Sequence, residues 1–122
     1  MAAMSAEQVV EDLLERFRKW DIDGMLELFA DDAVYHNIPM EPTVGVAAIR
    51  EVLDAFAGMM QDLQIEVHHQ LADDTLVMQE RTDSFTLGET TVSVPICGVF
   101  EVQDGMIRRW REYFDMNQAA GQ

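Results

Sequence analysis

A pair of strands and the turn that joins them are encoded by TTVSVPICGVFEVQDGMIRRWREYFD, residues 90–115. Apolar residues recur on both sides of Asp104-Gly105, which is the strongest short-range hairpin signal in the chain. Both central positions of a type I′ turn need positive φ, which Gly adopts without strain and Asp tolerates. We therefore predict antiparallel strands at residues 90–102 and 106–115.

Two further strands are predicted upstream of this hairpin. Period-two alternation starts at Leu63, and another strand covers residues 75–87. A sheet of such strands encloses a pocket where the strands bend, and Pro95 and Gly98 are the expected positions of a bulge or kink. Cys97, the single cysteine, lies between them in an apolar run, and we predict a small buried hydrophobe rather than a nucleophile.

Three helices are expected in the N-terminal half of the chain. Ser5 and Gln8 resemble a capping box at the start of the first helix, and Asp23 is the expected N-cap of a short second helix. The third should pack its apolar stripe on a sheet. The stripes of the three helices consist of Val9, Val10, Leu13, Leu14, Phe17 and Trp20, then Met25, Leu28 and Phe29, then Ile49, Val52, Leu53, Phe56, Ala57 and Met60.

A short strand is predicted at residues 33–38, between the second and third helices. Asp31-Asp32 should turn the chain into it, and Pro39 should end it because proline cannot donate to a ladder. A loop with Pro42 and Gly45 then leads to the third helix. This order of elements predicts one α+β domain over residues 1–122, with a curved, mostly antiparallel sheet and the helices on its concave face.

Charge and composition exclude several classes of function. The formal net charge of -15 repels phosphate backbones and anionic lipid, and no segment concentrates Lys and Arg enough to overcome that field. We therefore expect neither a nucleic-acid partner nor a membrane surface. Residues 1–5 carry no basic segment of the kind that begins a secretory signal, so we expect a cytoplasmic protein.

Two polar pairs and a single glutamate interrupt apolar strands in a pattern that favours an acid–base site. Tyr35 and Asn37 leave one face of their strand, Arg81 and Asp83 leave one face of theirs, and Glu112 shares a face with Trp110 and Phe114. If these faces converge, an arginine lies between two carboxylates in an apolar cavity. The carboxylates can then titrate apart, which provides a general base and a general acid in one site. Taken alone, Arg81 with Asp83 and Glu112 are more typical of a solvated surface, and Tyr35 with Asn37 of ordinary strand and turn residues.

The combination of motifs resembles the limonene-1,2-epoxide hydrolase family, in the same order and at similar separations over nearly the whole chain. The segments that carry the resemblance are Val34-Tyr35-His36-Asn37-Ile38-Pro39-Met40, Glu80-Arg81-Thr82-Asp83, Gly98-Val99-Phe100, Asp104-Gly105 and Trp110-Arg111-Glu112-Tyr113-Phe114-Asp115. The resemblance implies a cone-shaped fold of the NTF2-like and ketosteroid-isomerase-like superfamily. It also implies hydrolysis of an epoxide in one step, without a covalent intermediate or a metal, by a homodimer.

The resemblance also implies a role for each matching residue. Asp83 matches the general acid that protonates the epoxide oxygen, and Arg81 matches the arginine that bridges the two acids. Tyr35 and Asn37 match the pair that orients the attacking water. The family base is an aspartate in a Trp-Arg-Asp-Tyr-Phe-Asp motif, where this chain has Glu112. The additional methylene would move the base by about an ångström, and small misplacements can cost about 10²-fold in rate.

The residues expected to line a pocket for a small lipophilic epoxide are Trp110, Phe114, Phe85, Met60 and Ile96. No cofactor is expected, and the three histidines do not form a recognisable metal site. His68 and His69 are adjacent and should point to opposite faces of their strand, while His36 faces away from Tyr35. Two alternatives stay open: an isomerase or cyclase of the same fold, and a non-catalytic module that binds a hydrophobic ligand.

Overall fold

The computed structural model describes residues 4–121, so part of the N-terminal segment considered above, residues 1–3, lies outside the described residues. Six strands form a single sheet in the order β2-β1-β6-β5-β4-β3. Neighbouring strands are antiparallel, except that β1 and β6 run parallel. The elements are α1 (Ala6–Arg18), α2 (Ile22–Leu26), β1 (Phe29–Asn37), β2 (Thr43–Val44), α3 (Val46–Met59), β3 (Gln61–Ala72), β4 (Leu76–Leu87), β5 (Thr90–Gln103), β6 (Met106–Tyr113) and α4 (Met116–Ala119).

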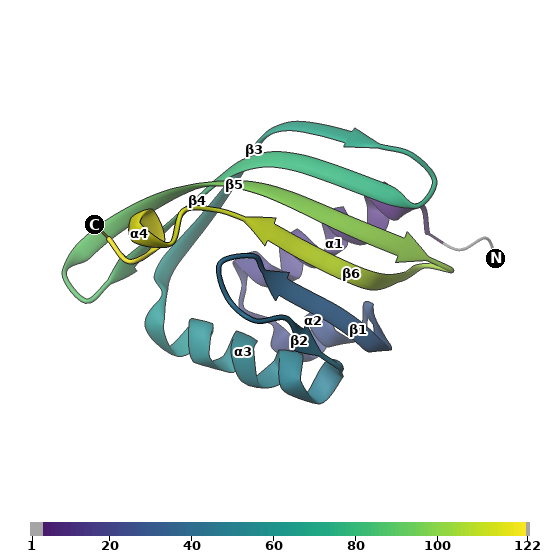
Figure 1. The fold of residues 1–122 in the computed structure, drawn as a ribbon, viewed down its shortest axis with the longest axis horizontal. Helices are drawn as coiled ribbons and strands as arrows, with labels where there is room; N and C mark the ends of the chain where they lie inside the picture. Colours follow the sequence, from purple (N-terminus) through teal and green to yellow (C-terminus); the bar gives the residue numbers. More distant parts are fainter. Residues whose placement is uncertain (1–3, 122) are drawn as a thin grey trace.

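The sheet curves around the first three helices, as Figure 1 shows. Helix α1 lies across the sheet behind β3, β4 and β5, whereas α3 runs beside β1 and β2. The α+β class, the mixed sheet and the placement of the helices on one side are thus confirmed. None of the helices within residues 4–121 combines the length and apolar character needed to span a lipid bilayer.

Local sequence signals explain where α1 begins and how the last hairpin turns. The Ser5 hydroxyl accepts from the Gln8 backbone N–H at 3.2 Å, and the Gln8 side chain accepts from the Ser5 N–H at 2.9 Å. The predicted capping box is therefore confirmed. Asp104 and Gly105 have φ of 55° and 75°, as a type I′ turn requires.

Four local predictions were wrong. Trp20 lies beyond the end of α1 with a φ of 53°, and α2 is capped by Asp21, whose carboxylate accepts from the Gly24 N–H at 3.0 Å, rather than by Asp23. Phe29 begins β1 instead of continuing α2, because it pairs with Ile107 of β6. The Asp31-Asp32 segment belongs to β1 and not to a turn. The strand can include two acidic residues because its register shifts between Phe29 and Val34, and this bulge leaves both carboxylates exposed.

A bulge at Pro95 or Gly98, one form of the predicted disruption, is also not observed. Along the described β4–β5 ladder the register runs unbroken through both residues, and β5 is instead shifted against β6 between Glu101 and Val102. Cys97 is exposed, contrary to expectation. Its neighbours in sequence, residues 96 and 98, take the inward positions, so alternation along the strand places the thiol on the outer face.

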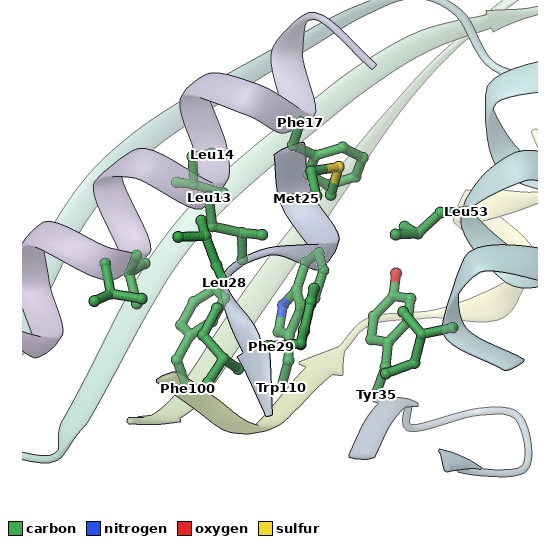
Figure 2. Packing of buried hydrophobic residues seen from close by; sticks show 14 of the residues in the cluster. Leu13, Leu14, Phe17, Met25, Leu28, Phe29, Tyr35, Leu53, Phe100 and Trp110 are labelled. Carbon is green, nitrogen blue, oxygen red and sulfur yellow. The ribbon is translucent and has the colours of Figure 1, made fainter. Parts of the chain in front are cut away.

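A layer of aromatic rings forms the centre of the core, between α1 and the sheet (Figure 2). The Trp110 indole is fully buried and stacks on Tyr35 with ring centroids 4.3 Å apart. Phe29 and Phe100 also stack on it, and Phe17 of α1 meets it edge-on at 5.7 Å. Such ring pairs stabilise a core by about 0.5–1.5 kcal/mol beyond area burial. This packing fixes the inner faces of β1 and β6, which carry the polar residues described next.

Candidate active site

Strand register brings the polar pairs together on the inner face of the sheet. Asn37 of β1 pairs with Glu112 of β6, which in turn pairs with Gly98 of β5. Gly98 pairs with Gln79 of β4, two residues before Arg81. Because all of these positions share a face, side chains from residues far apart in the sequence meet over Gly98.

Arg81 lies between two carboxylates and bonds to both oxygens of each. Its Nε and Nη2 donate to Asp83 at 3.0 and 2.8 Å. Its Nη1 and Nη2 donate to Glu112 at 3.1 and 2.5 Å. The exposed fractions are only 1% for Arg81, 4% for Asp83 and 3% for Glu112, so the charges are removed from water. Such bidentate pairs are the strong form of the ionic hydrogen bond.

Burial controls the electrostatics of Glu112. Loss of hydration raises the pKa of Glu112, since the ionised form is disfavoured in a dry environment, and the nearby Asp83 adds to this effect. The attraction and hydrogen bonds of Arg81 oppose it without cancelling it. With both carboxylates ionised, the three groups carry one net negative charge, whereas one added proton makes the buried cluster neutral. The site is therefore built to hold and release a proton.

The two neighbouring groups keep fixed protonation states. Burial by itself lowers the pKa of Arg81, but Glu112 and Asp83 outweigh it and the net shift is upward, so the guanidinium stays charged. Burial raises the pKa of Tyr35, and the Glu112 charge raises it further, against a hydrogen bond from Asn37. Tyr35 is therefore a neutral phenol at physiological pH. It can donate a hydrogen bond beside Glu112 without competing for the proton.

The absence of a side chain at Gly98 makes room for the ion pair. A Cβ placed on Gly98 would lie 2.7 Å from Nη1 of Arg81 and 2.7 Å from Oε2 of Glu112. Both distances are below van der Waals contact, and the two groups hold each other in place. Glycine thus accommodates the longer acid that occupies position 112.

We predict that Gly98→Ala lowers turnover by about 10²-fold while the protein still folds, because the methyl group displaces the reacting carboxylate by a fraction of an ångström to an ångström. The measurement is kcat/KM for the hydrolysis that the sequence resemblance implies. Gly58→Ala is the matched control, since no atom lies within 4 Å of the added Cβ and the site is on helix α3. Equal activity of the two variants would contradict the role of Gly98.

An apolar cavity of about 330 Å³ opens onto this cluster. Asp83, Glu112, Tyr35 and Asn37 form part of its wall, whereas Arg81 lies behind the two carboxylates. The remaining wall is almost wholly apolar. Its lining includes Phe17, Met40, Phe56, Met59, Met60, Phe85, Leu87, Val94, Ile96, Phe114, Met116, Ala119 and Ala120. The site can therefore receive a lipophilic molecule whose reacting atom meets the carboxylates.

Four of the five residues that the sequence placed in the wall line the cavity, and other parts of the wall were missed. Phe114, Phe85, Met60 and Ile96 line the cavity as predicted. Trp110 does not line it, because the indole is enclosed in the aromatic layer of the core. Helix α4, Met40 of the loop after β1 and Met59 at the end of α3 were missed, because residues distant in sequence meet there only in the folded chain. Gln79 was also missed, although period-two spacing from Arg81 was an available signal.

Metal chemistry has no evident ligand set among the residues that the structure covers. No group of three or more His, Cys, Asp or Glu side chains between residues 4 and 121 is placed to hold an ion. The His68 ring contacts Thr82 and the His69 ring contacts Glu80, each at 2.8 Å, while His36 contacts the Met40 carbonyl at 2.9 Å. The polar groups that meet the cavity are two carboxylates, a phenol and an amide.

Comparison with known families identifies the class. Residues 4–120 match the model of the limonene-1,2-epoxide hydrolase catalytic domain. The chain therefore belongs to the limonene-1,2-epoxide hydrolase family, and it is an enzyme of the epoxide hydrolase class.

Individual relatives agree with this assignment. The chain is 35% identical to epoxide hydrolase EphG of Mycobacterium tuberculosis over 107 residues, which is 88% of this chain and 71% of the relative. A solved structure of an M. tuberculosis epoxide hydrolase of this type superposes with a TM-score of 0.80 and 33% identity, covering 91% of this chain and 83% of the other. A protein from Catenulispora acidiphila with a ketosteroid isomerase-like fold matches at TM-score 0.83 and 14% identity, with 94% and 90% of the two chains covered, so it shares the fold.

Proposed function

We propose that the protein adds water to a small lipophilic epoxide in one step and releases a vicinal diol. The observation that carries this proposal is the Arg81 clamp, which holds two carboxylates side by side in the wall of an apolar cavity. A carboxylate pair bridged by a cation can supply one proton and accept another within the same site. This is the chemistry that opening a strained ring with water requires.

Water is activated on the Glu112 side of the site. Asn37 pairs with Glu112 across the β1–β6 ladder, and the two side chains line the cavity together with Tyr35. Glu112 accepts a proton from the water as the oxygen attacks an epoxide carbon, while Tyr35 and Asn37 orient the molecule by hydrogen bonds. Burial raises the pKa of Glu112, and a general base works best when its pKa lies near the working pH.

The leaving oxygen is protonated on the Asp83 side. As the carbon–oxygen bond of the epoxide breaks, the proton of the Asp83 carboxyl moves to that oxygen, and the second hydroxyl of the diol is complete. Glu112 then holds the proton taken from water and Asp83 is ionised. Arg81 donates to an oxygen of each carboxylate through Nη2, so it stabilises both charge distributions as the proton returns to Asp83.

Glutamate at position 112 is compatible with this role. Both Oε atoms of Glu112 reach Arg81, and the open space over Gly98 receives the longer side chain. The carboxylate is 3% exposed yet faces the cavity, which is where a base must meet its water. These contacts support an active enzyme over a site disabled by the change from the family aspartate.

The proposal is tested by Asp83→Asn, which keeps the shape of the side chain but removes its proton. We expect diol formation from limonene oxide or styrene oxide to fall by about 10²- to 10⁴-fold. Asp54→Asn, at an exposed position of α3, is the matched control and should retain full activity. Turnover of a broad epoxide panel is measured first in the unaltered protein, and no diol from any epoxide would refute the proposal.

Isotope labelling separates hydrolysis from the alternatives. One-step hydrolysis places one ¹⁸O atom from labelled water in each diol, whereas an isomerase or cyclase incorporates none. A non-catalytic module would bind the epoxide in the cavity without product. The homodimer implied by the family, the cytoplasmic location and the identity of the epoxide stay predictions.

A further inference from the structure

A buried amide, Gln79, contacts Arg81 and takes no part in the reaction proposed above. Gln79 is 2% exposed and lies on β4 two residues before Arg81. We propose that Gln79 is a positioning residue that holds the Arg81 guanidinium against Glu112. The effect on turnover rests on the proposed function, but the positioning itself is a property of the folded protein and can be tested without a substrate.

Gln79 accepts a hydrogen bond from the one N–H group of Arg81 that is not bonded to Asp83 or Glu112. A guanidinium has five N–H groups and no acceptor, and each needs a partner when buried. Four of them go to Asp83 and Glu112, as described above. The fifth, on Nη1, is directed to Oε1 of Gln79 at 3.4 Å. With Gln79 in place, all five donors of a fully buried cation are satisfied.

The position of Gln79 in the sheet explains how one nitrogen reaches two partners. Gln79, Gly98 and Glu112 are consecutive partners across β4, β5 and β6. Because Gly98 has no side chain, Nη1 of Arg81 occupies the space over it and meets Glu112 on one side and Gln79 on the other. Nη1 is therefore held from both sides, which fixes the rotation of the guanidinium plane.

A hydrogen-bond relay to the surface fixes the orientation of the Gln79 amide. Nε2 of Gln79 donates to Oε1 of Gln70 at 2.6 Å, and Nε2 of Gln70 donates to Glu7 of α1 at 2.9 Å. An ionised Glu7 can only accept hydrogen bonds and Arg81 can only donate them, so both ends of the relay require the same orientation of the two amides between them. The relay therefore keeps the carbonyl oxygen of Gln79, rather than its NH₂ group, directed at Arg81.

A carboxylate introduced at this position would act on every charged group of the site. Asp83, on the same strand β4, contacts Arg81, as does Glu112 of β6, and Tyr35 of β1 is near enough to feel their charges. Glu7 of α1 stands at the outer end of the relay. The α3 residues of the cavity wall, Phe56 and Met59, and the adjoining Met60 are uncharged. A third carboxylate on Arg81 competes for its attraction and repels Glu112, so Glu112 takes up a proton at higher pH.

The experiment is a ¹³C NMR titration of the side-chain carboxyls in the unaltered protein and in Gln79→Glu, which is close to isosteric. We expect the Glu112 titration to move upward by about one pH unit or more. Gln64→Glu, an exposed position on β3, makes the same change outside the cluster and should leave Glu112 unmoved. An unmoved Glu112 in Gln79→Glu would overturn the proposal, whether or not the protein hydrolyses an epoxide.

A second variant keeps the proposal testable if the additional charge prevents folding. Gln79→Leu removes the acceptor without adding charge, so hydrogen exchange of the Arg81 side-chain N–H groups, followed by ¹⁵N NMR, should accelerate by about 10-fold or more as the group loosens. In turnover, kcat should fall about 10-fold with little change in KM, because the substrate does not touch residue 79. Unchanged exchange would overturn the proposal, whereas absence of diol from the unaltered protein would count only against the proposed function.

Discussion

Glu112→Gln is expected to lower diol formation by about 10²- to 10⁴-fold and to leave the protein at least as stable near neutral pH. Glutamine has nearly the same shape and its amide oxygen still accepts from Arg81, but it cannot take a proton from water. Arg81 remains paired with Asp83 through Nε and Nη2. The buried cluster then carries no net charge, which removes a cost of burial that the native pair bears.

The sign of the stability effect follows from the direction of the pKa shift. The pKa of Glu112 is raised in the folded protein, chiefly by burial, so the folded state binds a proton more tightly than the unfolded chain. The associated stability is fully present below the unfolded pKa and is lost as pH rises through the folded pKa. Glutamine does not ionise, so this part of the pH dependence should disappear from the free energy of unfolding.

The measurements are kcat/KM and urea unfolding across the range from pH 4 to pH 8. The basic limb of kcat/KM for the unaltered protein should lie above the range of an exposed glutamate, since burial raises the pKa of Glu112 and the reaction needs the one proton that the two acids share. Glu89→Gln, in the exposed turn between β4 and β5, is the control and should alter neither quantity. A Glu112→Gln variant that keeps full turnover would remove Glu112 from the mechanism.

At this site the charge needed for function lowers the stability of the fold. The charge that makes Glu112 a base is the same charge that burial disfavours. Arg81 reduces this conflict by binding both acids, and Gly98 leaves the space that the arrangement needs. The conflict is what makes such a site detectable, because acids with perturbed pKa values cluster at functional sites beside cavities.

Much of the sheet and of the site was predictable because both depend on local spacing. Period-two alternation identified β3 to β6 within a few residues, and it placed Arg81 with Asp83 on one face of a strand. The Asp104-Gly105 turn fixed the last hairpin through backbone conformation alone. These signals need no knowledge of distant partners.

The failures occurred where tertiary contacts override local preference. Phe29 fits a helical stripe, but parallel pairing with β6 draws it into β1. Trp110 has the size of a pocket residue, but Phe17 and Phe100 enclose it. The burial of Arg81 could not follow from spacing either, since it depends on β6 lying beside β5 and on β1 pairing in parallel with β6. The family resemblance supplied that part of the site.

The largest loss of stability is expected for Arg81→Gln. Removing the cation leaves Asp83 and Glu112 buried without their partner, and breaking a buried pair in this way typically costs about 3–5 kcal/mol. Glutamine can donate two N–H groups but carries no charge. We therefore expect the free energy of unfolding at pH 8 to fall by about that amount, and epoxide hydrolysis to be lost with it.

Lower pH should restore stability to the variant, which separates lost charge from lost packing. Protonation of the two acids removes their repulsion, so the free energy of unfolding of Arg81→Gln should rise as pH falls from 8 to 5. Chemical unfolding at each pH measures this change. Arg111→Gln is the control, because Arg111 pairs with Glu101 where both side chains are partly exposed, and about 1 kcal/mol or less is expected there. A loss for Arg81→Gln that is equal at pH 5 and pH 8 would mean that Arg81 acts through packing, and that the two carboxylates do not share its charge.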